Sequence, residues 1–144
     1  MIRKLAALAL AATLPLAALA DEVWSLPSGN QIVYDRDTGD TAVLSYKPEQ
    51  GLENGWIFMP GLAGVYEGRG TYKGYWVEAD GAGEACPAAL VDAEGNTWNR
   101  WGLIEIKFAK PDFPSKLKIT RGTCLDGFTS KTITAKPVVG AGIQ

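Results

Sequence analysis

Short apolar runs with alternating polar positions recur along the chain, separated by glycines and prolines. In LIEIKF (103–108) the two isoleucines and the phenylalanine point to one side of an extended strand, and the glutamate and lysine point to the other. In LKITR, Leu117 and Ile119 share a face in the same way. This period of two predicts half-buried strands. The predicted strands are 23–26, 31–35, 41–46, 56–59, 71–78, 88–91, 103–108, 117–121 and 131–135.

The segments between these runs have the composition of turns. DRDTGD (35–40) and DAEGN (92–96) carry the acidic residues and glycine of tight hairpin turns. No segment after residue 20 shows a capped apolar stripe of helical period. The pattern therefore predicts an all-β protein, a small antiparallel β-barrel or β-sandwich of about eight strands. We expect residues 21–144 to form a single domain.

The first twenty residues differ from the rest of the chain. Arg3 and Lys4 precede the apolar run LAALALAATLPLAALA, which ends in small residues, and the acidic pair Asp21 and Glu22 follows. This order predicts a secretory signal peptide over 1–20, cleaved before Asp21. An uncleaved anchor is the alternative. The sequence therefore predicts a periplasmic or secreted protein, without a lipid-attachment cysteine and without a membrane span in the mature chain.

The sequence contains two cysteines, Cys86 and Cys124. In an exported chain an even number of cysteines most economically forms disulfides. A redox or nucleophilic role would favour a CxxC spacing or a histidine to activate the thiolate, and the chain has neither. We therefore predict one Cys86–Cys124 disulfide, which would stabilise the fold by about 4 kcal/mol on a chain-entropy model.

The charge of the chain is acidic overall and unevenly distributed. The sequence has 16 acidic and 14 basic side chains. Residues 21–94 are strongly acidic, whereas residues 95–144 are basic, although interleaved strands need not turn this into two poles. Nothing resembles the basic stripe of a nucleic-acid-binding domain, so no nucleic-acid partner is expected.

The absence of histidine narrows the chemistry. It removes Ser–His and Cys–His nucleophile arrangements and histidine-based proton shuttles. Carboxylates remain, since Glu78, Asp80 and Glu84 lie near Trp76. On one side of an extended strand, Glu78 and Asp80 could act as a glycoside-hydrolase pair, which is one alternative function. We otherwise predict no catalytic residue, no cofactor and no metal ligand.

The segment DRDTGD also invites a calcium interpretation. Asp35, Asp37 and Asp40 offer oxygen donors. The segment departs from an EF-hand loop because Gly39 comes one position early and Tyr46 occupies the place of the bidentate glutamate. We therefore favour a hairpin turn over a weak cation site.

Aromatic side chains concentrate in and around the stretch GTYKGYWVEADGAGEACP (70–87). Tyr75 and Trp76 are neighbours on a predicted strand, so they face opposite sides and one of them should be in the core. Exposed tyrosine and tryptophan are favoured at recognition surfaces, because they bury much area at little entropic cost. The candidate binding residues are Tyr66, Tyr72, Tyr75, Trp76, Glu78 and Asp80.

One stretch resembles a known family. GLAGVYEGRGTYKGYWVEADG (61–81) is similar to the middle of the periplasmic and lipid-anchored inhibitors of c-type lysozyme, with Gly64, Tyr66, Tyr75 and Trp76 at roughly matching spacing. The resemblance implies a similar small exported barrel in a similar compartment. The inhibitory serine of that family has no counterpart within 61–64, so no functional residue is carried over.

These observations lead to a non-enzymatic binding module as the main functional hypothesis. It would act as a protein inhibitor of the lysozyme-inhibitor type, using an aromatic surface patch, and its net negative charge would steer it toward a cationic protein. The alternative is a small-molecule or glycan-binding barrel of the cell envelope, with the ligand inside or at the mouth of the barrel. A structural envelope protein without its own ligand is a third possibility.

Overall fold

The computed structural model describes residues 21–49, 53–81, 83–128 and 131–140, so the predicted signal peptide lies outside the described residues. The described residues form ten strands. Their bounds are β1 (Val23–Ser25), β2 (Gln31–Thr38), β3 (Thr41–Tyr46), β4 (Gly55–Pro60), β5 (Thr71–Glu78), β6 (Leu90–Val91), β7 (Thr97–Trp98), β8 (Arg100–Phe108), β9 (Leu117–Arg121) and β10 (Ile133–Val138). None of the described segments is a helix with the length and apolar character needed to cross a membrane.

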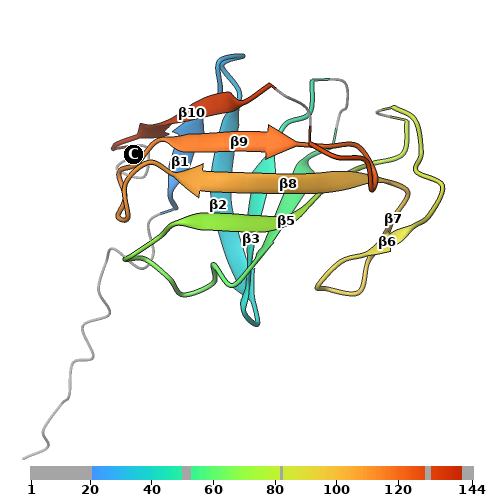
Figure 1. The fold of residues 1–144 in the computed structure, drawn as a ribbon, viewed down its shortest axis with the longest axis horizontal. Helices are drawn as coiled ribbons and strands as arrows, with labels where there is room; N and C mark the ends of the chain where they lie inside the picture. The colour runs from blue at the N-terminus through green and yellow to red at the C-terminus, as the bar shows by residue number, and fades with distance from the viewer. Residues whose placement is uncertain (1–20, 50–52, 82, 129–130, 141–144) are drawn as a thin grey trace, which may run out of the picture.

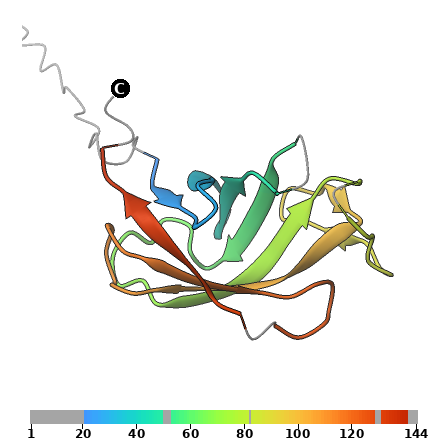
Figure 2. The same cartoon turned by 90° about the horizontal axis from the view of Figure 1, so that it is seen from above.

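Eight of these strands close into an antiparallel barrel in the order β1-β10-β9-β8-β5-β4-β3-β2. Strands that follow one another in the chain are neighbours in the barrel, except that the hairpin β6–β7 is inserted between β5 and β8. Figure 1 shows β5, β8 and β9 side by side, and Figure 2 shows the sheet curling round from β10 to β4. The predicted all-β class is confirmed, and of the two predicted architectures the barrel is the one formed.

The predicted strands match the observed ones best where alternation is regular. Strands β3, β5 and β9 have the predicted bounds, whereas β8 begins earlier, at Arg100, and β10 begins later, at Ile133. Strand β6 is limited to two residues, and its partner β7 was not predicted. Two-residue strands are too short to show a period of two, which explains this difference.

The barrel interior is filled by side chains from every strand of the barrel. The predicted alternation of β8 is confirmed, because Ile104, Ile106 and Phe108 are buried and Lys107 is exposed. Trp24 and Trp76 are the largest fully buried side chains of this core. The other buried members are Ile32, Tyr34, Ala42, Leu44, Tyr46, Ile57, Met59, Leu62, Leu117, Ile119 and Ala135.

One end of the barrel is closed by the segment 61–70, which joins β4 to β5. Leu62 from this segment is buried in the core, and the Arg69 side chain is fully buried. The guanidinium of Arg69 donates to both carboxylate oxygens of Glu22, at 2.5 and 2.8 Å, and through Nε to the Val65 carbonyl at 2.8 Å. Bidentate pairing of this kind satisfies a buried arginine, so this end of the barrel is tightly held.

A second apolar cluster lies on the outer wall of the barrel. We call it the outer-wall cluster; its buried members are Val43, Phe58, Val77 and Trp101. Leu90 and Trp98 of the β6–β7 hairpin pack against it, as does Cys86. The predicted disulfide Cys86–Cys124 is present. The hairpin therefore covers part of the outer wall, and the predicted turn at 92–96 is the one that joins β6 to β7.

Candidate functional site

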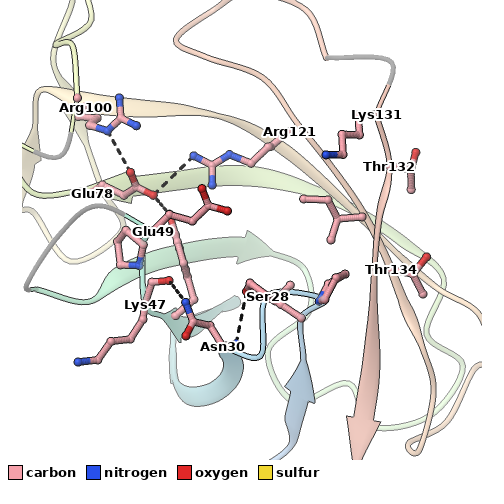
Figure 3. Close-up of a pocket in the computed structure, with 16 residues that line it drawn as sticks. Ser28, Asn30, Lys47, Glu49, Glu78, Arg100, Arg121, Lys131, Thr132 and Thr134 are labelled. Carbon is pink, nitrogen blue, oxygen red and sulfur yellow. Dashed lines mark hydrogen bonds and ion pairs between the residues drawn. The ribbon is translucent and has the colours of Figure 1, made fainter.

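The end of the barrel opposite segment 61–70 carries a pocket. We call it the mouth pocket; its volume is about 930 Å³. It forms where β1, β3, β5 and β9 end and where β2, β8 and β10 begin. Its lining residues are Leu26, Pro27, Ser28, Asn30, Tyr46, Lys47, Pro48, Glu49, Glu78, Gly83, Arg100, Arg121, Lys131, Thr132, Ile133 and Thr134 (Figure 3).

Glu78 lies at the centre of a polar network in this pocket. It is only 4% exposed. Its carboxylate accepts hydrogen bonds from the Tyr46 hydroxyl at 2.7 Å and from Arg100 Nε at 3.0 Å, and it forms an ion pair with Arg121 at 3.6 Å. Burial raises the pKa of Tyr46 well above its ordinary value, so this hydroxyl remains a donor.

The strand register explains why these groups meet. Glu78 is the last residue of β5 and pairs with Arg100, the first residue of β8. In the next barrel strand, Arg121 of β9 pairs with Ile104 of β8, whose side chain is in the core. Because side chains alternate across a strand, Glu78 shares the inward face with Trp76, and Arg121 shares it with Ile119.

Trp76 forms the base of the network. The Cζ atom of Arg121 lies 3.8 Å from the centroid of its ring, and the Cζ of Arg100 lies 5.4 Å away. The indole Nε1 donates to the Gly122 carbonyl at 2.7 Å. A Cβ at Gly102 would lie 2.4 Å from this indole nitrogen, so glycine at 102 makes room for the ring. These contacts fix the indole, and cation–π attraction holds both guanidinium groups over it.

An apolar hollow of about 70 Å³ continues from the mouth pocket toward the barrel interior. It shares Leu26, Tyr46, Arg121 and Ile133 with the mouth pocket. Its other lining residues are Ile32, Ile57, Trp76, Ile104 and Ile119. The site thus combines a charged upper part with a small apolar floor, the composition expected of a small-molecule pocket.

The structure distributes the predicted aromatic residues over different parts of the barrel. Tyr66 is 51% exposed in segment 61–70 and lies near Tyr34 and Arg69. Tyr72 is half-buried and packs edge-on against Phe108. These two tyrosines therefore belong to the closed end of the barrel and do not contribute to the mouth pocket.

Tyr75 and Trp76 face opposite sides of β5, as expected. Tyr75 is 37% exposed on the outer wall and meets Trp101 edge-on. Trp76 is the core residue of the pair, 1% exposed. Of the aromatic candidates, Trp76 alone lies at the mouth, where it lines the apolar hollow.

The carboxylates of Glu78 and Asp80 do not lie on one side of a strand, as predicted. Strand β5 ends at Glu78, so Asp80 lies in the turn beyond it and the two do not share a strand face. Asp80 is exposed and accepts a hydrogen bond from Asn99 at 3.3 Å. Glu84 is also exposed. The expectation of a carboxylate pair projecting from one strand is therefore wrong, because the strand terminates between its two members.

The predicted hairpin between β2 and β3 is formed, with Gly39 at a positive φ of 59°, but its turn is shorter than the segment DRDTGD: residues 35–38 continue β2, and only Gly39 and Asp40 lie between the strands. Its aspartates have separate partners: Asp35 pairs with Arg36, Asp37 accepts from the Tyr34 hydroxyl, and Asp40 accepts from Thr41. Among the described residues, no three acidic or sulfur ligands gather in a way that could hold a metal ion.

Of the residues that line the mouth pocket, Glu78 was among the predicted site residues, whereas Tyr46, Arg100, Arg121 and Lys131 were not. A signal for three of them is present in the strand pattern. Each lies an even number of positions from a core residue of its strand and so points to the same face. The pairs are Tyr46 with Leu44, Arg100 with Ile104, and Arg121 with Ile119. A charged residue on the apolar face at a strand end indicates a polar group at the rim of a barrel.

Comparison of the chain with protein-family models, with curated proteins and with solved structures found no match.

Proposed function

We propose that this chain is an exported, non-enzymatic binding module that holds a small ligand at the mouth of its barrel. The observation that carries the proposal is the pocket of about 930 Å³, in which arginine and lysine side chains surround an apolar floor. Pockets of this volume accommodate small molecules in other proteins. Small barrels commonly bind a ligand in this position.

The groups in the pocket favour binding over catalysis. The chain has no histidine. The Glu78 carboxylate accepts hydrogen bonds from the Tyr46 hydroxyl and Arg100 and forms an ion pair with Arg121, so both of its oxygens are occupied. Glu78 is therefore better suited to positioning the two arginines than to transferring a proton.

The disulfide supports the exported location. Disulfides persist in secreted and periplasmic proteins and are rare in reducing compartments. The Cys86–Cys124 bond closes a separation of 38 residues and anchors the segment that covers the outer wall. Together with the predicted signal peptide, this favours a periplasmic or extracellular protein.

Native mass spectrometry of the protein purified from its own host tests the proposal. We expect a co-purified small molecule, and titration with that molecule should shift the NMR signals of Ser28, Glu78 and Thr132 at the mouth. NMR shifts confined to the outer wall near Tyr75 would contradict the proposal. It would also be contradicted if no small molecule, either co-purified or added, shifts the signals of the mouth residues.

Recognition of a protein partner is the second candidate, and the exposure of Tyr75 favours it. This tyrosine is 37% exposed beside Trp101, on an outer wall that is already apolar. An inhibitor of a cationic enzyme such as lysozyme would use a surface of this kind. Inhibition of c-type lysozyme that is lost in Tyr75→Ala but kept in Tyr66→Ala would support it. Equal inhibition by both variants would place the contact elsewhere.

A further inference from the structure

We propose that the ligand of the mouth pocket is a small organic anion, with a carboxylate, phosphate or sulfate group held by Arg121 and Lys131 and joined to a short apolar group. This inference rests on the proposed function and adds the chemical class of the ligand. It is carried by the strand register at the mouth, by the balance of charge in the pocket and by the size of the apolar hollow.

The register brings two like charges together. Strands β9 and β10 pair Leu117 with Ala135 and Ile119 with Ile133. The hydroxyls of Thr120 and Thr132, 3.4 Å apart, continue this register beyond the last strand pair. The next facing positions are those of Arg121 and Lys131, and both side chains line the mouth pocket. Figure 3 shows the Lys131 amino group on the side of the pocket toward Arg121.

Facing like charges destabilise a sheet unless an anion lies near both of them. Glu78 interacts with Arg121, but the same carboxylate also pairs with Arg100 and accepts from Tyr46. Lys131 takes part in none of the ion pairs between the described residues. An anionic group between Arg121 and Lys131 would reduce their repulsion.

The mouth pocket as a whole has more basic than acidic side chains. Its basic side chains are those of Lys47, Arg100, Arg121 and Lys131, and its acidic side chains are those of Glu49 and Glu78. The chain as a whole has more acidic than basic residues, so this excess is local. Arg100 donates to Glu78 through Nε, and its two terminal nitrogens are not part of that hydrogen bond. They offer a further contact to an anionic ligand.

The apolar hollow sets the size of the uncharged part. Its volume of about 70 Å³ lies directly below the charged groups, and Leu26 and Ile133 line both spaces. Trp24, Trp76 and Leu44 fill the barrel beyond it, so a long acyl chain has no room in the interior. A short alkyl group or the edge of a ring fits this hollow, whereas the anionic group stays in the wider mouth.

The experiment is an NMR and calorimetric titration of the disulfide-bonded protein with matched probes. Benzoate and phenyl phosphate combine a charge with a short apolar group, benzamide lacks the charge, and inorganic phosphate lacks the apolar group. A neutral trisaccharide represents glycan ligands. We expect the two organic anions to bind at millimolar concentration or tighter, to shift the signals of the mouth residues, and to bind more weakly as salt is added.

Two variants locate the anion site. Lys131→Met removes one charge at the mouth, and we expect roughly tenfold weaker binding of benzoate, as for loss of one charge-assisted hydrogen bond. Lys118→Met is the matched control, because Lys118 belongs to the same hairpin but is exposed on the opposite face. Binding by Lys118→Met should equal that of the unmodified protein, and circular dichroism should show that both variants are folded.

The outcomes separate the two proposals. Mouth shifts with benzamide or the trisaccharide, but not with the organic anions, would overturn the anion inference and leave the mouth pocket as a binding site. Equal binding of benzoate by Lys131→Met and by the unmodified protein would also overturn it. If neither these probes nor any co-purified molecule perturbs the mouth, both the inference and the proposed function fail.

Discussion

At the scale of single residues, Glu78 has the greatest influence on the mouth pocket. Its buried carboxylate holds Arg100 and Arg121 over Trp76. We predict that Glu78→Gln lowers the free energy of unfolding by about 2 kcal/mol, because the two partly exposed guanidinium groups lose the charge that they share. Urea denaturation followed by circular dichroism measures this change.

Asp80→Asn is the control for that substitution. Asp80 is two residues away but exposed, and it accepts a hydrogen bond from Asn99 at 3.3 Å. Exposed substitutions of this kind usually change stability by less than about 0.5 kcal/mol. Equal effects of the two substitutions would show that Glu78 is no more important to the fold than a surface acid.

Gly102 is the second residue on which the site depends. An added Cβ would lie 2.3 Å from the Gly122 carbonyl oxygen and 2.4 Å from the Trp76 indole nitrogen. We predict that Gly102→Ala destabilises the protein by about 1–3 kcal/mol, as is typical of overpacking. It should also shift the Trp76 side-chain signal in NMR spectra, because the indole must move.

Gly70→Ala tests whether that effect is specific. Gly70 has no atom within 4 Å of its added Cβ and no positive φ, so alanine should be tolerated there. A loss of stability in Gly70→Ala as large as that in Gly102→Ala would mean that flexibility of glycine, and not contact with Trp76, explains the result.

At this scale the sequence predicted side-chain direction better than side-chain partners. Alternation correctly separated Tyr75 from Trp76. The inward faces of Glu78 and Arg121 follow the same alternation but were not predicted. The meeting of Glu78 with Arg100 depends on the pairing of β5 with β8 across the inserted hairpin. Pairing between strands that are separated by an insertion is not readable from local periodicity.

At the scale of elements, the β6–β7 hairpin is fastened to the barrel by charge. Glu94 lies in the turn between β6 and β7. Its carboxylate accepts hydrogen bonds from Arg36 Nε at 2.8 Å and from the Thr38 hydroxyl at 2.8 Å, and both partners belong to β2. These hydrogen bonds lower the pKa of Glu94 from an ordinary value of 4.5 to about 2. Trp98 adds a hydrogen bond to Asp92 within the hairpin.

The lowered pKa predicts a pH dependence for this element. A carboxyl with a depressed pKa in the folded state contributes stability above its unfolded pKa and loses it as the pH falls. Attachment of the hairpin should therefore weaken between about pH 4.5 and about pH 2. NMR titration of the Glu94 carboxyl and hydrogen exchange of the hairpin amides measure it.

Glu94→Gln should remove most of the pH dependence of hairpin exchange in that range. Glu84→Gln is the control, because Glu84 is exposed and precedes the same hairpin. A Glu94 carboxyl that titrates near its ordinary value would show that its bonds to β2 are not maintained in solution, and the fastening by charge would be rejected.

The hairpin also marks the limit of prediction at the element scale. Its turn was recognised from DAEGN, and the strands of the barrel were recognised from their alternation. Its location outside the barrel was not predicted, because its packing against Val43, Phe58 and Trp101 depends on the tertiary fold and not on local sequence. The residues that cover an outer wall have the same local composition as those that fill an interior.

At the scale of the whole molecule, closure of the barrel depends on the short strand β1. Its three residues pair with β10 on one side and with β2 on the other. Trp24 lies at the middle of this strand and is fully buried. Its indole donates to the Ser115 carbonyl at 2.9 Å and packs edge-on against Phe108 and Phe113. Trp24 thus joins the seam of the barrel to its closed end.

We predict that Trp24→Ala destabilises the protein by about 3–5 kcal/mol, the usual range for a fully buried aromatic residue. Because every strand of a closed barrel is paired on both sides, opening of the seam removes pairing from β10 and β2 together. Unfolding should therefore remain a single transition, with coincident midpoints for far-ultraviolet circular dichroism and tryptophan fluorescence.

Tyr75→Ala, which truncates an exposed aromatic, should change the midpoint much less. Two separate transitions in Trp24→Ala would instead mean that β1 and β10 unfold independently of the remaining strands, and that the mouth pocket can persist in an open sheet.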